Sequence, residues 1–168
     1  MPQINDVQGL MVFGLQELYS AEQQALAAYP QIVQAVSSPE LQQALQQHMQ
    51  ETQTQVQRLE QLAQQMGVSA QGETECAAAQ GLITDAQRLV QMIAPGPVLD
   101  AAIIGAAQKL EHLEIAGYGT ARTLAQQMGQ TQAAQVLEQT LSEEKATDDR
   151  LTQLAEAQVN QEAAQTSG

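Results

Sequence analysis

Seven residues of types that bind metals or exchange protons fall on or beside the apolar faces of long helical segments. They are Glu22, His48, Glu51, Glu111, Glu114, Glu144 and Asp148. The other inward residues of these segments are Leu, Val, Ala and Met. Burying an unpaired charge costs several kcal/mol, so carboxylates in such places need compensation. A pair of divalent metal ions held from all four helices of a bundle provides it, and the pattern therefore predicts a dimetal site.

Five helical segments must position these residues. Apolar residues recur at helical spacing over about residues 4–36, 39–66, 75–93, 98–128 and 131–158. Ala, Gln, Leu and Glu dominate and aromatic residues make up 2%, which is typical of long-helix proteins. The short third segment lets the chain cross from one helix pair to the other. We expect an all-α fold, with a four-helix bundle over 1–158 whose long crossover contains a short fifth helix, and a flexible tail over 159–168.

The breaks between these segments carry their own signals. Ser38 is placed as an N-cap, with Pro39 in the first turn and Glu40 as a capping carboxylate. Gly67 and Gly129 stand where a helix-terminating C′ glycine is expected. These positions predict where the second and fourth segments end and where the second begins.

Charge and cysteine content exclude several classes of partner. The 168 residues carry a formal net charge of −13 with six Lys plus Arg, so neither nucleic acid nor an anionic membrane is expected as a partner. No stretch reaches the roughly 18 apolar residues of a membrane span, and the N-terminus has no secretory pattern. The single cysteine, Cys76, excludes an internal disulfide. We expect a soluble, cytoplasmic protein.

Helical periodicity separates inward from outward carboxylates. Glu22 lies within about 40° of the apolar direction of its segment, whereas Glu17 lies about 100° away. His48 occupies a core position, with Glu51 one turn on and towards the flank. In the fourth segment Glu114 is inward with Glu111 beside it.

Two patterns disagree about the last segment. A shift of 92 residues superimposes Glu22 on Glu114 and Glu51 on Glu143, which suggests an internal repeat and nominates Glu143. The apolar series of the segment instead places Glu144 and Asp148 inward. We prefer the apolar face, because burial is the physical requirement for the site.

The chemistry of these ligands indicates the metal. Ligands that are mostly oxygen atoms, with one imidazole, suit two iron ions, with manganese as the alternative and zinc as a substitute. They differ from the thiolate ligands of a structural zinc site. The usual di-iron pattern places His three residues after Glu on two helices. Here His48 precedes Glu51, and Thr54 and Thr147 stand three residues after Glu51 and Glu144. Each residue also has an explanation that involves no metal. The histidine can be hydrogen-bonded in the core, and a glutamate can be solvated at the edge of its helix.

Four motifs resemble the YciF/YciE-type ferritin-like family of bacterial stress-response proteins. They are Ala-Glu-x-Gln from residue 21, His-x-x-Glu-Thr from 48, Glu-x-x-Glu-Ile-Ala-x-Tyr from 111 and Glu-Glu-Lys-x-x-Asp from 143. The resemblance covers nearly the whole chain. It implies a ferritin-like bundle, a homodimer and a rubrerythrin-like dimetal centre, with the motif acids on the seven residues named above. It supplies no reaction.

Three classes of function follow from these observations. The first is a redox metalloprotein acting on O2 or peroxide, with Tyr19 or Tyr118 beside the metal ligands. The second is metal binding without turnover, as sequestration or sensing. The third is a structural helical module whose acids are paired or protonated. A multi-subunit storage cage has no positive support in the sequence.

Overall fold

The computed structural model describes residues 3–73 and 75–166, and every regular element in these ranges is helical. The five long helices are α1 (Val7–Ala35), α2 (Pro39–Gln65), α3 (Ala77–Met92), α4 (Pro97–Gln127) and α5 (Thr131–Leu154). A π-helical turn (Ala155–Val159) and the short α6 (Asn160–Gln165) follow. The predicted all-α fold and its five helical segments are confirmed, with ends that differ by a few residues.

The helix ends use the signals identified in the sequence. The Ser38 hydroxyl accepts a hydrogen bond from the Leu41 amide at 3.3 Å, and Pro39 opens α2. Gly67 and Gly129 follow α2 and α4 with φ of 71° and 69°, a conformation that glycine adopts without steric cost. These caps satisfy backbone groups that would otherwise be unpaired at the helix ends.

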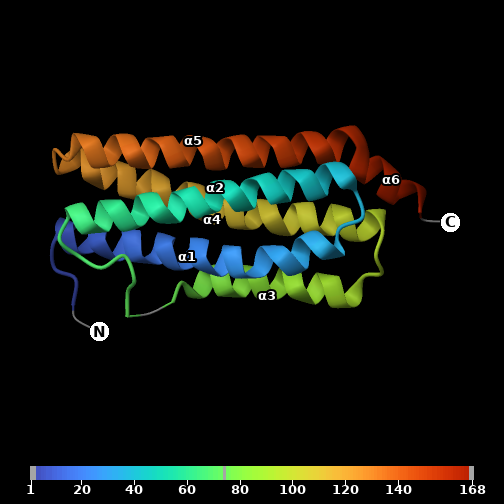
Figure 1. Cartoon of the computed structure of the whole chain (residues 1–168), viewed down its shortest axis with the longest axis horizontal. Helices are drawn as coiled ribbons and strands as arrows, with labels where there is room; N and C mark the ends of the chain where they lie inside the picture. The colour runs from blue at the N-terminus through green and yellow to red at the C-terminus, as the bar shows by residue number, and fades with distance from the viewer. Residues whose placement is uncertain (1–2, 74, 167–168) are drawn as a thin grey trace.

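Four of the helices form a bundle, and α3 lies outside it. Consecutive helices reverse direction, so that α1, α3 and α5 run one way and α2 and α4 the other (Figure 1). Within the bundle α1 contacts α2 and α4, and α5 contacts the same two helices, while α3 packs against α1 and α4. The short α3 therefore carries the chain from the α1/α2 hairpin to the α4/α5 hairpin, as the sequence predicts.

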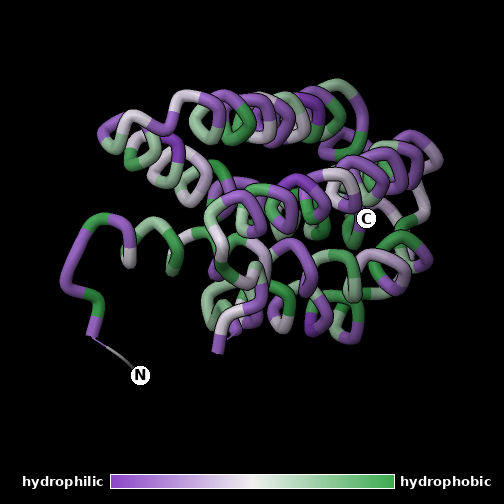
Figure 2. The backbone as a smooth tube through the Cα atoms, turned by 60° about the vertical axis from the view of Figure 1, so that its left-hand side comes forward, coloured by the Kyte–Doolittle hydropathy of each residue, from purple (hydrophilic) through white to green (hydrophobic). Residues whose placement is uncertain are grey.

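The core is divided into two apolar clusters. One includes Tyr29, Leu45 and Ile103, and the other, towards the opposite end of the bundle, includes Leu15, Leu59 and Tyr118. Green hydrophobic and purple hydrophilic segments alternate along the helices in Figure 2, as expected for amphipathic helices. Between the clusters, buried polar side chains from α1, α2, α4 and α5 form a middle layer. Glu22, His48, Glu111, Glu114 and Glu144 are its acidic and imidazole members.

The C-terminal end differs from the sequence expectation. Residues 160–165, placed by the sequence in a flexible tail over 159–168, are helical. The preceding π-helical turn keeps both Ala155 and Val159 buried, and α6 contacts α4. Residues 167–168 lie outside the described residues.

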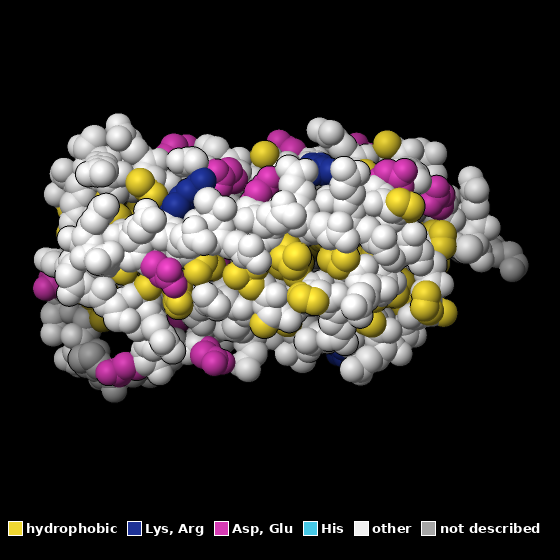
Figure 3. Space-filling view, viewed as in Figure 1, with side chains coloured by type: hydrophobic (Ala, Val, Ile, Leu, Met, Phe, Trp, Pro, Cys, Tyr) yellow, Lys and Arg dark blue, Asp and Glu magenta, His cyan; other side chains and the backbone are white. Residues whose placement is uncertain are grey.

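The surface reflects the acidic composition. Acidic side chains are spread over the face in Figure 3, where few Lys and Arg side chains are seen. Across residues 3–73 and 75–166, none of the helices has the combination of length and hydrophobicity needed to span a bilayer.

Candidate metal centre

Four buried side chains from three helices converge in the middle layer. His48 of α2, Glu111 and Glu114 of α4 and Glu144 of α5 can each offer one ligand atom such that these atoms all lie within 4.8 Å of one another. All four are almost inaccessible to solvent, at 0 to 3% exposure. Glu111 and Glu114 share a face because residues three apart on a helix are neighbours.

His48 lies between inner and outer groups. Its Nε2 is 2.9 Å from Glu111 Oε1 and 3.9 Å from Glu144 Oε2, inside the bundle. Its Nδ1 is 3.2 Å from the Thr147 hydroxyl and 3.8 Å from Glu51 Oε2, on the outer side. One ring nitrogen therefore faces the carboxylates of the cluster, while the other is held by groups that fix the orientation of the ring.

Glu22 joins the layer from α1. Its Oε1 accepts a hydrogen bond of 2.5 Å from the Tyr118 hydroxyl of α4. The two helices approach closely at this point. A Cβ added at Gly117 would lie only 2.7 Å from Leu18 Cδ2. Glycine at this position thus permits the α1/α4 contact that brings Tyr118 to Glu22.

Most potential ligand atoms of the cluster have no hydrogen-bond partner. Glu111 and Glu144 leave both carboxylate oxygens unpaired, and Glu114 leaves Oε1 unpaired. The short contact of His48 Nε2 with Glu111 is an ion-pair distance without the alignment of a hydrogen bond. Buried polar atoms are normally paired, and bare oxygens around an imidazole are the donors that iron or manganese binds. The residues therefore fit a metal site.

Burial and mutual repulsion alter the acidity of these groups. Burial raises the pKa of Glu22 to about 7, against the lowering effect of the Tyr118 hydrogen bond. Burial, with the nearby Glu22 carboxylate, raises the pKa values of Glu114 and Glu144 well above the usual range. Burial alone would lower the pKa of His48, but the carboxylates of Glu111, Glu51 and Glu144 together outweigh it and hold that pKa well above its ordinary value.

Two of the predicted residues lie at the edge of the layer. Glu51 is about one third exposed, at 36%, and its pKa is lowered chiefly by hydrogen bonding with His48. Asp148 accepts a hydrogen bond from Gln108 at 3.0 Å and lies 3.4 Å from Nε2 of the exposed His112. Neither belongs to the four-residue cluster. The structure thus brings together His48, Glu111, Glu114 and Glu144, with Glu22 adjoining them.

The two candidates on α5 point in different directions. Glu144 is fully buried in the layer, whereas Glu143 forms an ion pair of 2.5 Å with Arg58 of α2. The apolar face therefore predicted the inward residue, and the repeat did not. Arg150, which the repeat places on Arg58, hydrogen-bonds Gln47 of α2.

One neighbour of the site was not singled out from the sequence. The ring of Tyr29 packs edge-on against the His48 ring, with ring centroids 5.6 Å apart and an interplanar angle of 89°. Tyr29 stands seven residues after Glu22, so the same helical periodicity places it on the same face. Of the two tyrosines expected near the ligands, Tyr118 contacts Glu22, while Tyr19 hydrogen-bonds the exposed Glu60 instead.

Comparison with known proteins gives the family. Residues 7–164 match the family described as a domain of unknown function, DUF892. Protein YciF of Escherichia coli K12 is 41% identical over 157 residues, which cover 94% of this chain and 95% of that protein.

Comparison with solved structures gives the same family. The crystal structure of the E. coli stress protein YciF matches with a TM-score of 0.88 at 40% identity, covering 94% of this chain and 99% of that one. YcfI of Rhodopseudomonas palustris, proposed to be a structural protein, matches with a TM-score of 0.86 at 38% identity over 89% of this chain and 95% of that one. A protein of Xanthomonas campestris, with a TM-score of 0.70 at 23% identity over 90% of this chain and 92% of that one, shares the fold. The chain belongs to the DUF892 family of YciF-type proteins.

Proposed function

We propose that the chain binds two divalent iron or manganese ions in the middle layer of the bundle and uses them on dioxygen or peroxide during stress. The observation that carries the proposal is the set of unpaired buried oxygens of Glu111, Glu114 and Glu144 facing His48 Nε2. Leaving such groups unpaired costs about 1 to 3 kcal/mol each, and more when they are charged. A bound metal would remove this cost.

The residues have distinct parts in the proposed centre. His48, Glu111, Glu114 and Glu144 would hold the first ion, since they form the compact cluster. Glu22 would contribute to a second ion, with the Tyr118 hydrogen bond holding its carboxylate in place. The four residues of the cluster and Glu22 would together hold the two ions.

The outer groups would position the ligands. Glu51 and Thr147 contact Nδ1 of His48 and would fix the ring so that Nε2 is available to metal. Asp148, held by Gln108, would act at the edge of the site and not as a direct ligand in this conformation.

The chemistry requires access for an oxidant. When bound, iron or manganese supplies electrons to an oxygen species through its change of oxidation state. A cavity of about 110 Å³ between α2 and α5, lined by His48, Glu51, Thr147 and Arg150 among others, gives polar molecules a path towards His48. Hydrogen-bonding groups line this path, which suits water and hydrogen peroxide.

A passive role is the second candidate. The 2.9 Å contact between His48 and Glu111 lets the metal-free cluster neutralise part of its own charge. A helical module that sequesters metal, or is purely structural, would need no more than this, and the related YcfI is proposed to be structural. In either case we propose a homodimer, as the resemblance to YciF-type proteins implies, in the cytoplasm, as the sequence predicts.

Thermal melts and peroxide consumption separate these functions. Fe(II) or Mn(II) should raise the melting temperature of metal-free protein, whereas melts unchanged by metal would leave only the structural module. Loaded protein should then consume hydrogen peroxide faster than the same concentration of free metal. Consumption at the rate of free metal would favour passive binding.

A further inference from the structure

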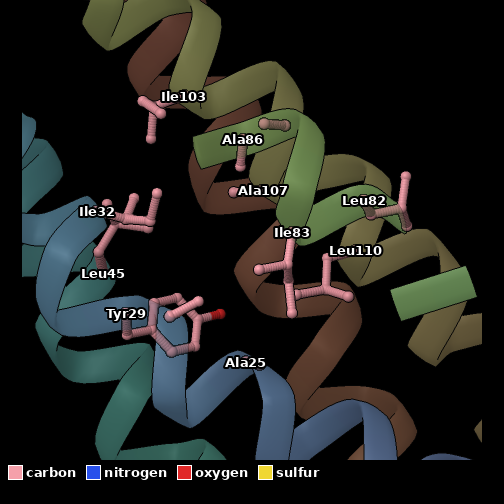
Figure 4. A pocket seen from close by; sticks show the side chains of 12 residues that line it. Ala25, Tyr29, Ile32, Leu45, Leu82, Ile83, Ala86, Ile103, Ala107 and Leu110 are labelled. Carbon is pink, nitrogen blue, oxygen red and sulfur yellow. The ribbon is translucent and has the colours of Figure 1, made fainter. Parts of the chain in front are cut away.

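A second, apolar cavity shares the lining residue Leu45 with the polar one. It has a volume of about 40 Å³, and its lining comes from α1, α2, α3 and α4 (Figure 4). Leu45 and Ile103 line its inner part, and Ile83 of α3 and Leu110 of α4 face each other at its outer part. A cavity needs roughly 10 to 15 Å³ to hold one water, so this one has room for a molecule of two heavy atoms.

The lining is almost free of polar groups. Tyr29 is the one lining residue with a polar side-chain atom, and its hydroxyl is directed towards Ile83 and Leu110 in Figure 4. A buried water needs two to four hydrogen-bond partners, which this lining does not provide. The cavity therefore favours a small apolar molecule over water or hydrogen peroxide.

The cavity also adjoins the proposed metal ligands. Ala25 lines it one helical turn after Glu22, and Leu45 lines it one turn before His48. One turn of α-helix is about 5.4 Å, so cavity and carboxylate layer are successive layers of the same core. Tyr29 spans the two, because its ring lines the cavity and packs edge-on against His48.

We propose that this cavity is a dioxygen-binding site that supplies the metal centre, with the Tyr29 ring between the gas and His48. The inference rests on the proposed dimetal function and deepens it by naming dioxygen as the oxidant held by the protein. Dioxygen is the small apolar oxidant, whereas peroxide would use the polar path beside Arg150. The outer wall is α3, whose side chains facing the cavity are only partly buried.

Paramagnetic relaxation by dissolved dioxygen tests the binding directly. Methyl-labelled protein loaded with diamagnetic Zn(II), or left metal-free, is placed under raised dioxygen pressure. The methyl groups of Ile103 should relax faster than those of Ile104, which is equally buried but does not line the cavity. Those of Ile83, which lines the cavity and is only partly buried, should be enhanced as well. Methyl groups of the exposed Ile4 report the effect of bulk dioxygen. Equal enhancement at Ile103 and Ile104 would overturn the proposal.

Filling the cavity tests its link to the centre. Ala107→Leu adds a side chain to the lining, while Ala102→Leu makes the same change on α4 away from the cavity. In Fe(II)-loaded protein, Ala107→Leu should slow oxidation of Fe(II) by dioxygen about tenfold, which corresponds to roughly 1.4 kcal/mol. Its consumption of hydrogen peroxide, and both rates in Ala102→Leu, should stay at wild-type values. Equal slowing with both oxidants would overturn the supply role.

Further variants guard against misfolding. Overfilling a core costs about 1 to 3 kcal/mol, so Ala86→Leu, which fills the cavity from α3, serves where Ala107→Leu does not fold. Ile83→Ala enlarges the cavity and should increase the dioxygen relaxation at Ile103. A chain that takes up no iron would overturn the proposed function, whereas iron uptake without relaxation at Ile83 and Ile103 would overturn the cavity proposal alone.

Discussion

Glu143 and Glu144 are adjacent in α5 but point in different directions from the helix. Glu143 pairs with Arg58 near the surface, whereas Glu144 is buried within 3.9 Å of His48. Successive residues of an α-helix point about 100° apart, so one residue can bind a surface arginine while the next enters the core. Conservative substitutions can therefore separate their contributions.

Glu144→Gln should reduce the metal content of the protein, because the substitution removes a charged donor from the cluster. Glu143→Gln should leave metal content near wild type and change stability by less than about 1 kcal/mol, since it weakens a partly exposed ion pair. Metal analysis of both variants after identical loading checks this. Loss of metal in Glu143→Gln alone would show that the internal repeat is the better guide.

The metal-free protein should become more stable as pH falls from 7.5 to 5. Burial raises the pKa of Glu22 to about 7 and the pKa values of Glu114 and Glu144 well above the usual range, so the folded state binds protons that the unfolded state, with ordinary values of about 4.3, has released. Because the folded state holds more protons, stability decreases as pH rises through this window. His48 acts with the same sign, since its pKa is also raised.

Metal should reverse this trend. Protons compete with metal for the same carboxylates, so Fe(II)- or Mn(II)-loaded protein should lose stability on acidification. Thermal melts at pH 5 and 7.5, with and without metal, measure both trends. Stability that rises with pH in the metal-free protein would contradict the buried, protonated cluster.

Tyr118→Phe should destabilise the metal-free protein by about 1 to 3 kcal/mol, because it leaves Glu22 Oε1 buried without its donor. The pKa of Glu22 should rise further, because the Tyr118 hydrogen bond stabilises the ionised form and the substitution removes it. Tyr19→Phe is the matched control, since its hydroxyl bonds Glu60 in an exposed position and its loss should cost less than about 0.5 kcal/mol. Urea titrations at pH 7.5 compare them. Equal losses of stability in the two variants would show that the Tyr118 hydrogen bond contributes no more than the exposed Tyr19 bond.

Helical periodicity predicted the inner part of the site but not its edge. The apolar faces placed Glu22, His48, Glu114 and Glu144 inward, because burial of a helix position depends mainly on its angle from the core. Glu51 lies on a flank, as the sequence indicates, but the apolar series was wrong to place Asp148 inward, because its side chain is partly exposed at the edge of the layer. Periodicity within one helix cannot show that His112 and Gln108 of α4 would meet Asp148.

Long-range contacts account for other features that the sequence did not reveal. Asp100 in the first turn of α4 accepts hydrogen bonds of 2.8 Å from the amides of both Ser37 and Ser38. This buried carboxylate holds the α1/α2 turn against α4, across more than sixty residues of sequence. The sequence identified Ser38 as a helix cap, because a cap depends on neighbouring residues. It gave no sign that Asp100 would bind the Ser38 amide.

Asp100→Ala should therefore lower the free energy of unfolding by about 2 to 3 kcal/mol, since amides at a buried turn lose their acceptor. Metal content should not change, because Asp100 lies outside the carboxylate cluster. Asp85→Ala, at an exposed site paired with Arg88, should change stability by less than about 0.5 kcal/mol. Chemical denaturation of the two variants checks the difference. A loss of metal in Asp100→Ala with folding intact would contradict the separation of turn and site.

Metal binding by the buried carboxylates is tested most directly by the metal content of the wild-type chain. After anaerobic loading with Fe(II) and removal of unbound metal, elemental analysis should find about two ions per chain, the number expected for a four-helix carboxylate site. Fewer than about 0.2 ions per chain, from protein that still unfolds cooperatively, would contradict the account.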